Sequence, residues 1–320
     1  LRRRSLALTR RGFDINSGES PWMTGSLEEC HQMIGRIIEE IAGSYREGVL
    51  AEGEEERYRA TRMTEVLKQA GWAMIQHVRQ GKLQAIYVEE SFGEGKGNSF
   101  PAIRIETGDE TVLIEGKIDR VDLLAGGRVK IIDYKSGNDR FDPAEAKAGW
   151  RLQLMLYLKA AMGGLSLENE QAKPAGVFYF TLSPPFFDAT GTGEGDLSLR
   201  LAEELRKAFR MDGVVLDDPE VIEGIAGEFS DYSEILPIRK SKDGSVSGNA
   251  PRKLLKEEEF QALVETVDDT IRNLCEAMVS GTADIRPKKT GRETACRYCG
   301  YQSICNFELS FVGCSYDVVK

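Results

Sequence analysis

Five side chains that could bind a metal ion or a phosphate group lie between residues 116 and 157, within or just after apolar runs. They are Asp119, Asp133, Lys135, Gln153 and Tyr157. Hydrolysis of a phosphodiester at neutral pH needs a nucleophile made from water and neutralisation of the charge that grows on the phosphate. Divalent metal ions supply both. The residue types therefore indicate metal-dependent phosphodiester hydrolysis.

The spacing of these residues predicts that they share one place. Two acids at the ends of adjacent strands, here Asp119 and Asp133, suit Mg²⁺, which prefers carboxylate oxygens and retained waters. Lys135 is two residues after Asp133 and points to the same face of its strand, where it would orient the attacking water or offset charge in the transition state. Gln153 and Tyr157 are four residues apart on a predicted helix and share one side. They would contact the DNA backbone or a flipped-out base, or hold the metal-binding strand.

Each of these residues also has an ordinary structural explanation. Asp119 and Asp122 would be acids at the end of a hairpin, Asp133 and Lys135 a surface ion pair, and Tyr157 a core aromatic. For any one residue the ordinary explanation is the commoner one. The ordered combination on a strand, a second strand and a helix favours a site.

Apolar periodicity predicts the elements that would position these side chains. Strands are expected over 85–90, 102–106, 111–118, 129–133 and 175–182, the last being a continuous apolar run typical of a buried central strand. Helices are expected from Ser26, with Glu29 completing a capping box, and over 54–80, 144–162 and 257–279. The stretch GEGKGNS lacks the first glycine and the final Lys-Ser/Thr of a phosphate loop, so we expect a hairpin-type connection.

The composition describes a globular chain whose 320 residues, 41% of them hydrophobic, can fill a real core. No apolar run reaches the roughly 18 residues of a membrane helix, and the start LRRRSLALTRRG lacks the apolar segment of a secretory signal. We therefore expect a cytoplasmic protein without membrane contact. A net charge of −10 argues against a chain that coats itself in nucleic acid. Basic residues still form three clusters, each of which alone would be ordinary surface: Arg2, Arg3, Arg4, Arg10 and Arg11; Arg239, Lys240, Lys242, Arg252, Lys253 and Lys256; and Arg286, Lys288, Lys289, Arg292 and Arg297.

Three of the six cysteines, Cys296, Cys299 and Cys305, lie close together near the end of the chain. In a cytosolic protein this spacing favours a metal site over disulfides. A [4Fe–4S] cluster or a structural zinc usually takes four ligands. Cys314 would complete a compact site that suits zinc. The chain has two histidines, so nothing supports a Ser/His/Asp triad or a histidine-based zinc enzyme.

The motifs GKIDRVD, IIDYKSG and QLMLYL resemble those of the PD-(D/E)xK nuclease superfamily, in the branch of RecB-type nucleases and Cas4-like proteins. The segment CRYCGYQSICNF is similar to the iron–sulfur signature of part of that branch. More narrowly, the order EECHQMIGRIIEE, VEESFGEG, KIDRVD, IDYKSG, MDGVVLDDPEV, KDGSVS and ADIRPKKTGRETACRYCGYQSICNF resembles the C-terminal part of the AddB family of ATP-dependent helicase/deoxyribonuclease subunits. The similarity covers nearly the whole chain.

By this resemblance Asp119 and Asp133 would bind magnesium, Lys135 would be catalytic, and Gln153 and Tyr157 would complete the nuclease motifs. The family works with the AddA helicase-nuclease on double-strand DNA ends before recombination and cuts one of the unwound strands. The resemblance also implies an ATP-driven motor. This chain contains no Walker sequence, so ATP use would belong to other regions or to the partner.

The resemblance favours an iron–sulfur cluster held by Cys296, Cys299 and Cys305, with Cys314 as a tail residue. The family's fourth cysteine lies upstream, before a helix whose histidine precedes the nuclease acids, and neither is recognisable in this chain. The chain begins at Leu1 without a methionine, which fits a fragment that starts just past that histidine, since His31 lies too far into the following helix. In the family the cluster fastens the C-terminal segment to the start of the nuclease domain.

The expected fold is an α/β nuclease core with a mixed sheet flanked by helices, followed by a C-terminal helical segment that ends in a cysteine-rich staple. We expect an N-terminal helical segment over residues 1–82, the core over 83–198 and the C-terminal segment over 199–320. The predicted function is a metal-dependent DNA exonuclease domain of an AddAB-type bacterial helicase-nuclease. Two alternatives are a stand-alone Cas4-like or RecB-family nuclease for single-stranded DNA, and a DNA-binding scaffold whose catalysis has lapsed.

Overall fold

The apolar run that starts at Ala175 forms β6 (Lys173–Thr181), which is buried along most of its length near the centre of a six-stranded sheet. The structure, a computed structural model, describes residues 15, 20–44, 53–95, 97–137, 139–168, 172–183, 200, 203–248, 250, 252–291 and 293–319. The first basic cluster, Arg292 and residues 184–196, whose sequence predicts a surface loop, lie outside the described residues. The prediction of a buried central strand is confirmed.

The main sheet is mixed, as predicted. Its strands in spatial order are β1 (Leu83–Phe92), β4 (Gly116–Leu124), β5 (Arg128–Lys135), β6, β7 (Asp212–Leu216) and β10 (Leu254–Leu255). Neighbours are antiparallel except for β5 with β6 and β7 with β10. The parallel pair β5 and β6 needs a crossover connection, which contains α6 (Pro143–Lys147) and α7 (Gln153–Glu168).

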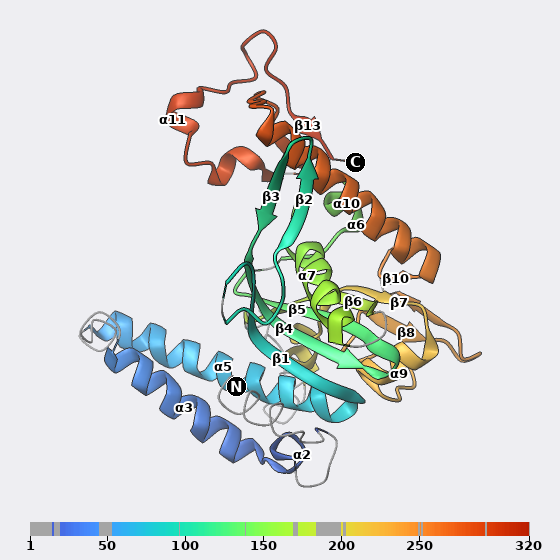
Figure 1. Cartoon of the computed structure of the whole chain (residues 1–320). Helices are drawn as coiled ribbons and strands as arrows, with labels where there is room; N and C mark the ends of the chain where they lie inside the picture. Colours follow the sequence, from blue (N-terminus) through green and yellow to red (C-terminus); the bar gives the residue numbers. More distant parts are fainter. Residues whose placement is uncertain are drawn as a thin grey trace.

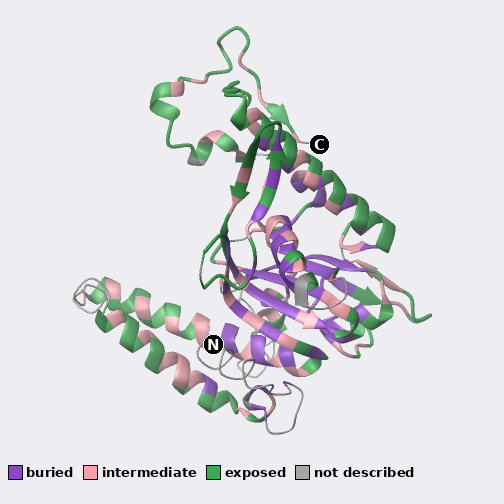
Figure 2. Ribbon diagram, viewed as in Figure 1, coloured by how far each residue is buried: buried purple, intermediate pink, exposed green. Residues whose placement is uncertain are grey.

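Helices cover both faces of this sheet (Figure 1). α7 packs on β4, β5 and β6. α5 (Glu54–Gln80) lies on the other face, where the His77 ring meets the Phe180 ring edge-on at 5.8 Å between centroids. Burial is concentrated in the sheet and in the helix faces that contact it, as Figure 2 shows. The remaining helical elements are α2 (Pro21–Thr24), α3 (Leu27–Ser44), α9 (Pro219–Ala226), α10 (Glu257–Val279), α11 (Gln302–Cys305), and the 3₁₀ turns η2 (Ala125–Gly127) and η3 (Ala295–Tyr298).

Three predicted helices are confirmed in type and position. α5 and α10 have the expected bounds. At the start of α3 the predicted capping box is present, because the Ser26 N–H donates to Glu29 Oε2 at 2.9 Å and the Glu29 N–H donates to Ser26 Oγ at 3.2 Å. α3 then runs along α5, and this helix pair extends away from the sheet (Figure 1).

The expected strand over 111–118 is wrong, because it is two strands in two sheets. β3 (Glu110–Ile114) pairs with β2 (Ile103–Thr107) as a separate hairpin, and after Glu115 the chain enters β4 of the main sheet. The hairpin assignment of GEGKGNS is also wrong. β1 pairs with β4 rather than with β2, and the glycine-rich turn leads into the β2–β3 hairpin, which projects from the sheet and contacts α10.

The expected helix over 144–162 is wrong as one element. It divides into α6 and α7, because Gly149 and Arg151 have φ values of 80° and 54°, outside the helical region. A distant contact holds the end of α6, since Thr270 Oγ1 donates to the Lys147 carbonyl at 2.9 Å. Local periodicity cannot reveal such a break.

The C-terminal part of the chain contributes to the main sheet before it forms its own small one. β7 and β10 lie after residue 199, so the sheet extends past the residue 198 at which the predicted core ends. A second hairpin is formed by β8 (Ile238–Lys240) and β9 (Val246–Gly248). The last segment forms a three-stranded sheet of β11 (Lys288–Thr290), β12 (Glu293–Thr294) and β13 (Asp317–Val318) in the order β12-β11-β13. Within the described ranges, no helix has the length and apolarity that a bilayer crossing requires.

Candidate nuclease site

The pairing of β4 with β5 sets the two candidate metal-binding acids against each other. The pairing includes Arg120 with Ile132, and one further step in the same register places Asp119 opposite Asp133. Directly opposed residues of an antiparallel pair have Cβ atoms about 4.5–5.5 Å apart on one face. The Tyr134 N–H donates to Asp119 Oδ2 at 2.9 Å and so fixes the first carboxylate.

Asp133 is the more enclosed of the two acids, at 2% exposure. Its Oδ2 atom is buried and lies 2.7 Å from Lys135 Nζ, but no contact to this oxygen has the full geometry of a hydrogen bond. Burial raises the pKa of Asp133, Lys135 opposes this effect, and the charge of Asp119 adds to it. Asp133 thus has one ammonium group and a second carboxylate, Asp119, beside it, and these three side chains carry one net negative charge.

Lys135 connects the acids to α7 through a chain of hydrogen bonds. Its Nζ donates to Gln153 Oε1 at 2.7 Å, and Gln153 Nε2 donates to the Tyr157 hydroxyl at 2.8 Å. The ammonium also lies 5.3 Å from the centre of the Tyr179 ring, on the neighbouring strand β6. The structure therefore brings all five candidate residues together.

The hydroxyl of Tyr157 is held in its protonated form. Burial raises the pKa of Tyr157, the hydrogen bond from Gln153 opposes this effect, and the nearby charges of Asp133 and Asp119 raise it further. Because the oxygen accepts from Gln153, the hydroxyl hydrogen is left to donate. Tyr157 is a hydrogen-bond donor facing an acidic site rather than a base.

A magnesium ion fits this arrangement of donors. The deficit of positive charge at Asp119 and Asp133, and the buried Asp133 oxygen without a properly oriented hydrogen bond, are what a divalent cation would relieve. Among the residues that the structure describes, no three His, Cys, Asp or Glu side chains come together to hold a metal ion. Mg²⁺ commonly takes one or two protein carboxylates and completes its shell with water and substrate phosphate, so two acids suffice.

The cysteines do not assemble a cluster site. All six thiols are free, and no three metal-ligating side chains converge in the described part of the C-terminal segment. Cys299 is exposed, whereas Cys296, Cys305 and Cys314 are partly exposed. This arrangement tests neither the [4Fe–4S] cluster nor the closed zinc site, and both assignments stay predictions.

Sequence reasoning missed a buried charged network on the other face of the same two strands. Arg120 donates to both oxygens of Asp122, with Nε at 2.6 Å from Oδ1 and Nη2 at 2.9 Å from Oδ2. Lys130 Nζ lies 2.6 Å from Asp122 Oδ2, and the side chains of all three residues are at most 4% exposed. The sequence did contain a signal for this network, because β4 and β5 are otherwise apolar strands and yet carry charged residues on both faces.

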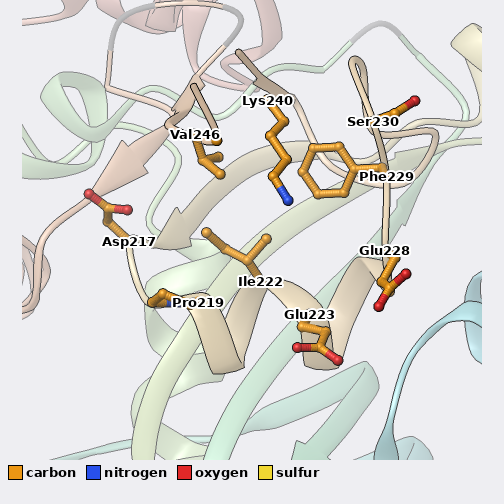
Figure 3. A pocket seen from close by; sticks show the side chains of 11 residues that line it. Asp217, Pro219, Ile222, Glu223, Glu228, Phe229, Ser230, Lys240 and Val246 are labelled. Atoms are coloured by element: carbon orange, nitrogen blue, oxygen red, sulfur yellow. The ribbon is translucent and has the colours of Figure 1, made fainter. Parts of the chain in front are cut away.

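A cavity of about 860 Å³ lies away from these residues, between α9 and the β8–β9 hairpin. Figure 3 shows the Lys240 ammonium pointing toward Ile222 and Phe229, with Glu223 and Glu228 to one side. None of the five candidate residues lines it. The five candidate residues lie instead around the carboxyl end of β5.

The family model described as the PD-(D/E)XK nuclease superfamily matches residues 22–306. The chain belongs to this superfamily. Within it, the chain is similar to AddB proteins, each named as a subunit of an ATP-dependent helicase/deoxyribonuclease. The relative from Thermoanaerobacter sp. (strain X514) is 33% identical over 312 residues, which are 96% of this chain and 26% of the relative. For Alkaliphilus oremlandii (strain OhILAs) the identity is 32%, covering 93% of this chain and 26% of the relative.

The chain spans about a quarter of the length of these curated relatives. As a PD-(D/E)XK nuclease, it has the predicted fold class, a mixed sheet flanked by helices. The match extends past the last strand of the main sheet into the cysteine segment.

Proposed function

We propose that this chain is the nuclease domain of an AddAB-type helicase-nuclease and that it hydrolyses phosphodiester bonds of single-stranded DNA with Mg²⁺. One observation carries the proposal. Asp119 faces Asp133, and Asp133 is joined through Lys135 and Gln153 to Tyr157. Family membership supports the same reaction class.

The two acids have the role of metal ligands in this proposal. A Mg²⁺ ion held by Asp119 and Asp133 would supply a water-derived nucleophile and neutralise the phosphate. The Tyr134 N–H keeps Asp119 turned toward the site. The enclosure of Asp133 limits water around it, which strengthens its electrostatic interactions.

Lys135 positions the reacting oxygen atoms. An ammonium group has three N–H donors: within the described residues one donates to Gln153, and the ion pair with Asp133 engages a second without full hydrogen-bond geometry. The third is available to donate to the attacking water or to a phosphate oxygen. Gln153 fixes the direction of the amine, and the Tyr157 hydroxyl can donate to the DNA backbone.

The role of a larger assembly rests on the name that the relatives share. We propose that the AddA helicase-nuclease unwinds duplex ends and delivers single strands to this domain, which cuts them exonucleolytically during double-strand break repair. ATP binding would belong to other regions or to AddA. The proposal predicts that linear strands are degraded while a circular single strand of the same sequence is not.

The test is degradation of end-labelled single-stranded DNA with Mg²⁺ by the chain and by Lys135→Ala. Loss of one charged donor to a transition state lowers the rate by roughly 100-fold to 1,000-fold. Lys159→Ala is a matched control, because Lys159 lies on α7 with similar exposure but pairs with Asp268 at 2.6 Å, away from the acids.

Each outcome has a distinct meaning. Equal activity in the parent and in Lys135→Ala would refute the catalytic assignment. An inactive parent that still binds single-stranded DNA would favour the scaffold alternative. Activity that persists in a chelator would refute the role of Mg²⁺.

The iron–sulfur cluster is a separate proposal with its own test. We propose that Cys296, Cys299 and Cys305 supply three ligands and that the fourth lies outside this chain. Protein purified without oxygen, in the full-length form of the relatives, should contain about four irons and four sulfides per chain. Stoichiometric zinc without sulfide would instead favour a closed site with Cys314.

A further inference from the structure

Arg151 occupies a strained position between α6 and α7, two residues before Gln153. It is one of four described non-glycine residues with positive φ, at 54°. Its side chain is 23% exposed and lies among three carboxylates. Nη1 is 3.4 Å from Asp139 Oδ1, Nε is 3.7 Å from Glu145 Oε2, and Nη2 donates to Glu293 Oε2 at 2.7 Å.

These carboxylates belong to three segments, two of them close to Arg151 in sequence and one 142 residues away. Asp139 follows the catalytic strand β5, Glu145 lies on α6, and Glu293 begins β12 of the C-terminal sheet. The link to that sheet is doubled, because Thr290 Oγ1 on β11 donates to Glu145 Oε1 at 2.6 Å. Arg151 therefore ties the hairpin of β11 and β12 to the loop that precedes α7.

The same loop sets the start of α7. The N–H groups of Met155 and Leu156 both donate to the Leu152 carbonyl at 3.0 Å. The first turn of α7 is therefore hydrogen-bonded to the residue that directly follows Arg151. Gln153 lies in this turn and accepts the hydrogen bond that orients Lys135. A shift of the loop would move the acceptor that holds the lysine.

We propose that Arg151 is a positioning residue through which the C-terminal β11–β12 hairpin holds Gln153 and Lys135 in place for cleavage. This inference rests on the proposed function. Cys296 follows β12 by two residues, so the cysteine segment continues directly from the hairpin that Glu293 joins to Arg151. The hairpin thereby regulates the site without contacting substrate.

The test breaks the contact from the side that is remote from the site. Glu293→Gln removes the carboxylate that Arg151 Nη2 binds, and it leaves every residue of the site intact. The matched control is Glu257→Gln. Glu257 receives two hydrogen bonds from Arg128 and joins the sheet to α10, with an exposure of 56% against 48% for Glu293.

Two measurements are made on the parent chain and on both variants. In steady-state cleavage of single-stranded DNA, Glu293→Gln should lower kcat roughly 10-fold to 100-fold with KM within about twofold, since misplacement of a catalytic group acts on the chemical step. In hydrogen exchange, amides of the first turn of α7 should exchange faster in Glu293→Gln, while those of β5 and β6 stay unchanged. Arg151→Ala should show the same pattern, and Glu257→Gln should match the parent in both measurements.

Equal kcat in Glu293→Gln and Glu257→Gln, or unchanged exchange in the first turn of α7, would overturn the inference. A rise in KM alone would also overturn it, because that result indicates a contact with DNA rather than positioning. An inactive parent would refute the proposed function, and the exchange measurement would then decide whether the hairpin controls α7.

Discussion

Replacement of Asp122 by Asn should be among the most destabilising single changes in this chain. The Asp122 side chain has no exposure and lies between the Arg120 guanidinium and the Lys130 ammonium. Burial opposes ionisation of Asp122, but Arg120 and Lys130 outweigh it, and the pKa of the carboxyl lies below its ordinary value. Asn keeps the shape of the side chain and removes its charge.

The magnitude follows from the two cations that the substitution leaves behind. Loss of one partner from a buried ion pair costs about 3–5 kcal/mol. The cost has an upper limit, because Lys130 can lose its proton instead of remaining as an unpaired charge, and burial already lowers the pKa of its amine below the ordinary 10.5. Removal of the proton from an ordinary lysine at pH 7 costs about 5 kcal/mol, so the substitution cannot cost much more than this. We therefore expect a loss of about 3–5 kcal/mol in the free energy of unfolding.

The assay is urea unfolding at pH 7, followed by circular dichroism. Glu257→Gln is the control for an exposed pair and should cost at most about 1 kcal/mol. Lys130→Met should cost less than Asp122→Asn, because it leaves Arg120 and Asp122 as a neutral pair. A loss below about 1 kcal/mol for Asp122→Asn, or a larger loss for Lys130→Met, would refute this electrostatic reasoning.

Three further predictions concern other parts of the chain. Burial is the main cause that lowers the pKa of His77 from 6.5 to about 3, and the charges of Lys130 and Arg120 add to it. As pH falls below 6.5, the unfolded chain binds a proton on this histidine before the folded chain does. The free energy of unfolding should therefore decrease between pH 6.5 and about 3, by up to about 1.4 kcal/mol per pH unit. Urea midpoints should lose this slope in His77→Gln but keep it in His31→Gln. Gly213→Ala should cost about 3 kcal/mol or more in urea unfolding, since its Cβ would lie 1.9 Å from the Val177 carbonyl oxygen, and a cost below about 1 kcal/mol would contradict this. Mg²⁺ at 100 times its Kd should stabilise the parent chain by about 2.7 kcal/mol and so raise its Tm, whereas the Tm of Asp133→Asn should not change. Equal Tm shifts in the two proteins would contradict the metal site.

The relative placement of the candidate residues could be predicted from sequence because it depends on short-range geometry. Asp133 and Lys135 share a face through the alternation of a strand, and Gln153 and Tyr157 share a side through the helical turn. Asp119 and Asp133 meet because β4 and β5 pair antiparallel and are joined by the short turn η2. The roles of these residues stay predictions until the cleavage assay is done.

The break between α6 and α7 could not be predicted because distant contacts stabilise it. The apolar pattern over 144–162 is compatible with one helix, and positive φ at Arg151 is unfavourable for a residue with a side chain. It persists because Asp139, Glu145 and Glu293 all bind the guanidinium. Glu293 is 142 residues away in sequence, so no local pattern contains this information.

The ordinary explanation of Asp122 as an acid at a hairpin end was wrong for a similar reason. Sequence alone does not tell which face of a strand is covered, and α5 covers the face that carries Asp122. Because α5 covers this face, Asp122 is buried among Arg120 and Lys130 instead of being exposed to solvent. The ion pair of Asp122 with Lys130, which are directly opposed on β4 and β5, then favours the register that the site strands adopt.

The two faces of β4 and β5 have opposite electrostatic needs, and Tyr134 joins them. Its backbone N–H holds Asp119 on the site face, whereas its hydroxyl interacts with Arg120 in the buried network. Arg120, Lys130 and Asp122 together carry one net positive charge, whereas Asp119, Asp133 and Lys135 together carry one net negative charge. Within the proposal that Asp119 and Asp133 bind a metal ion, a positive network behind them would favour their ionised forms. Tyr134 is thus the residue through which the buried network and the candidate site are joined.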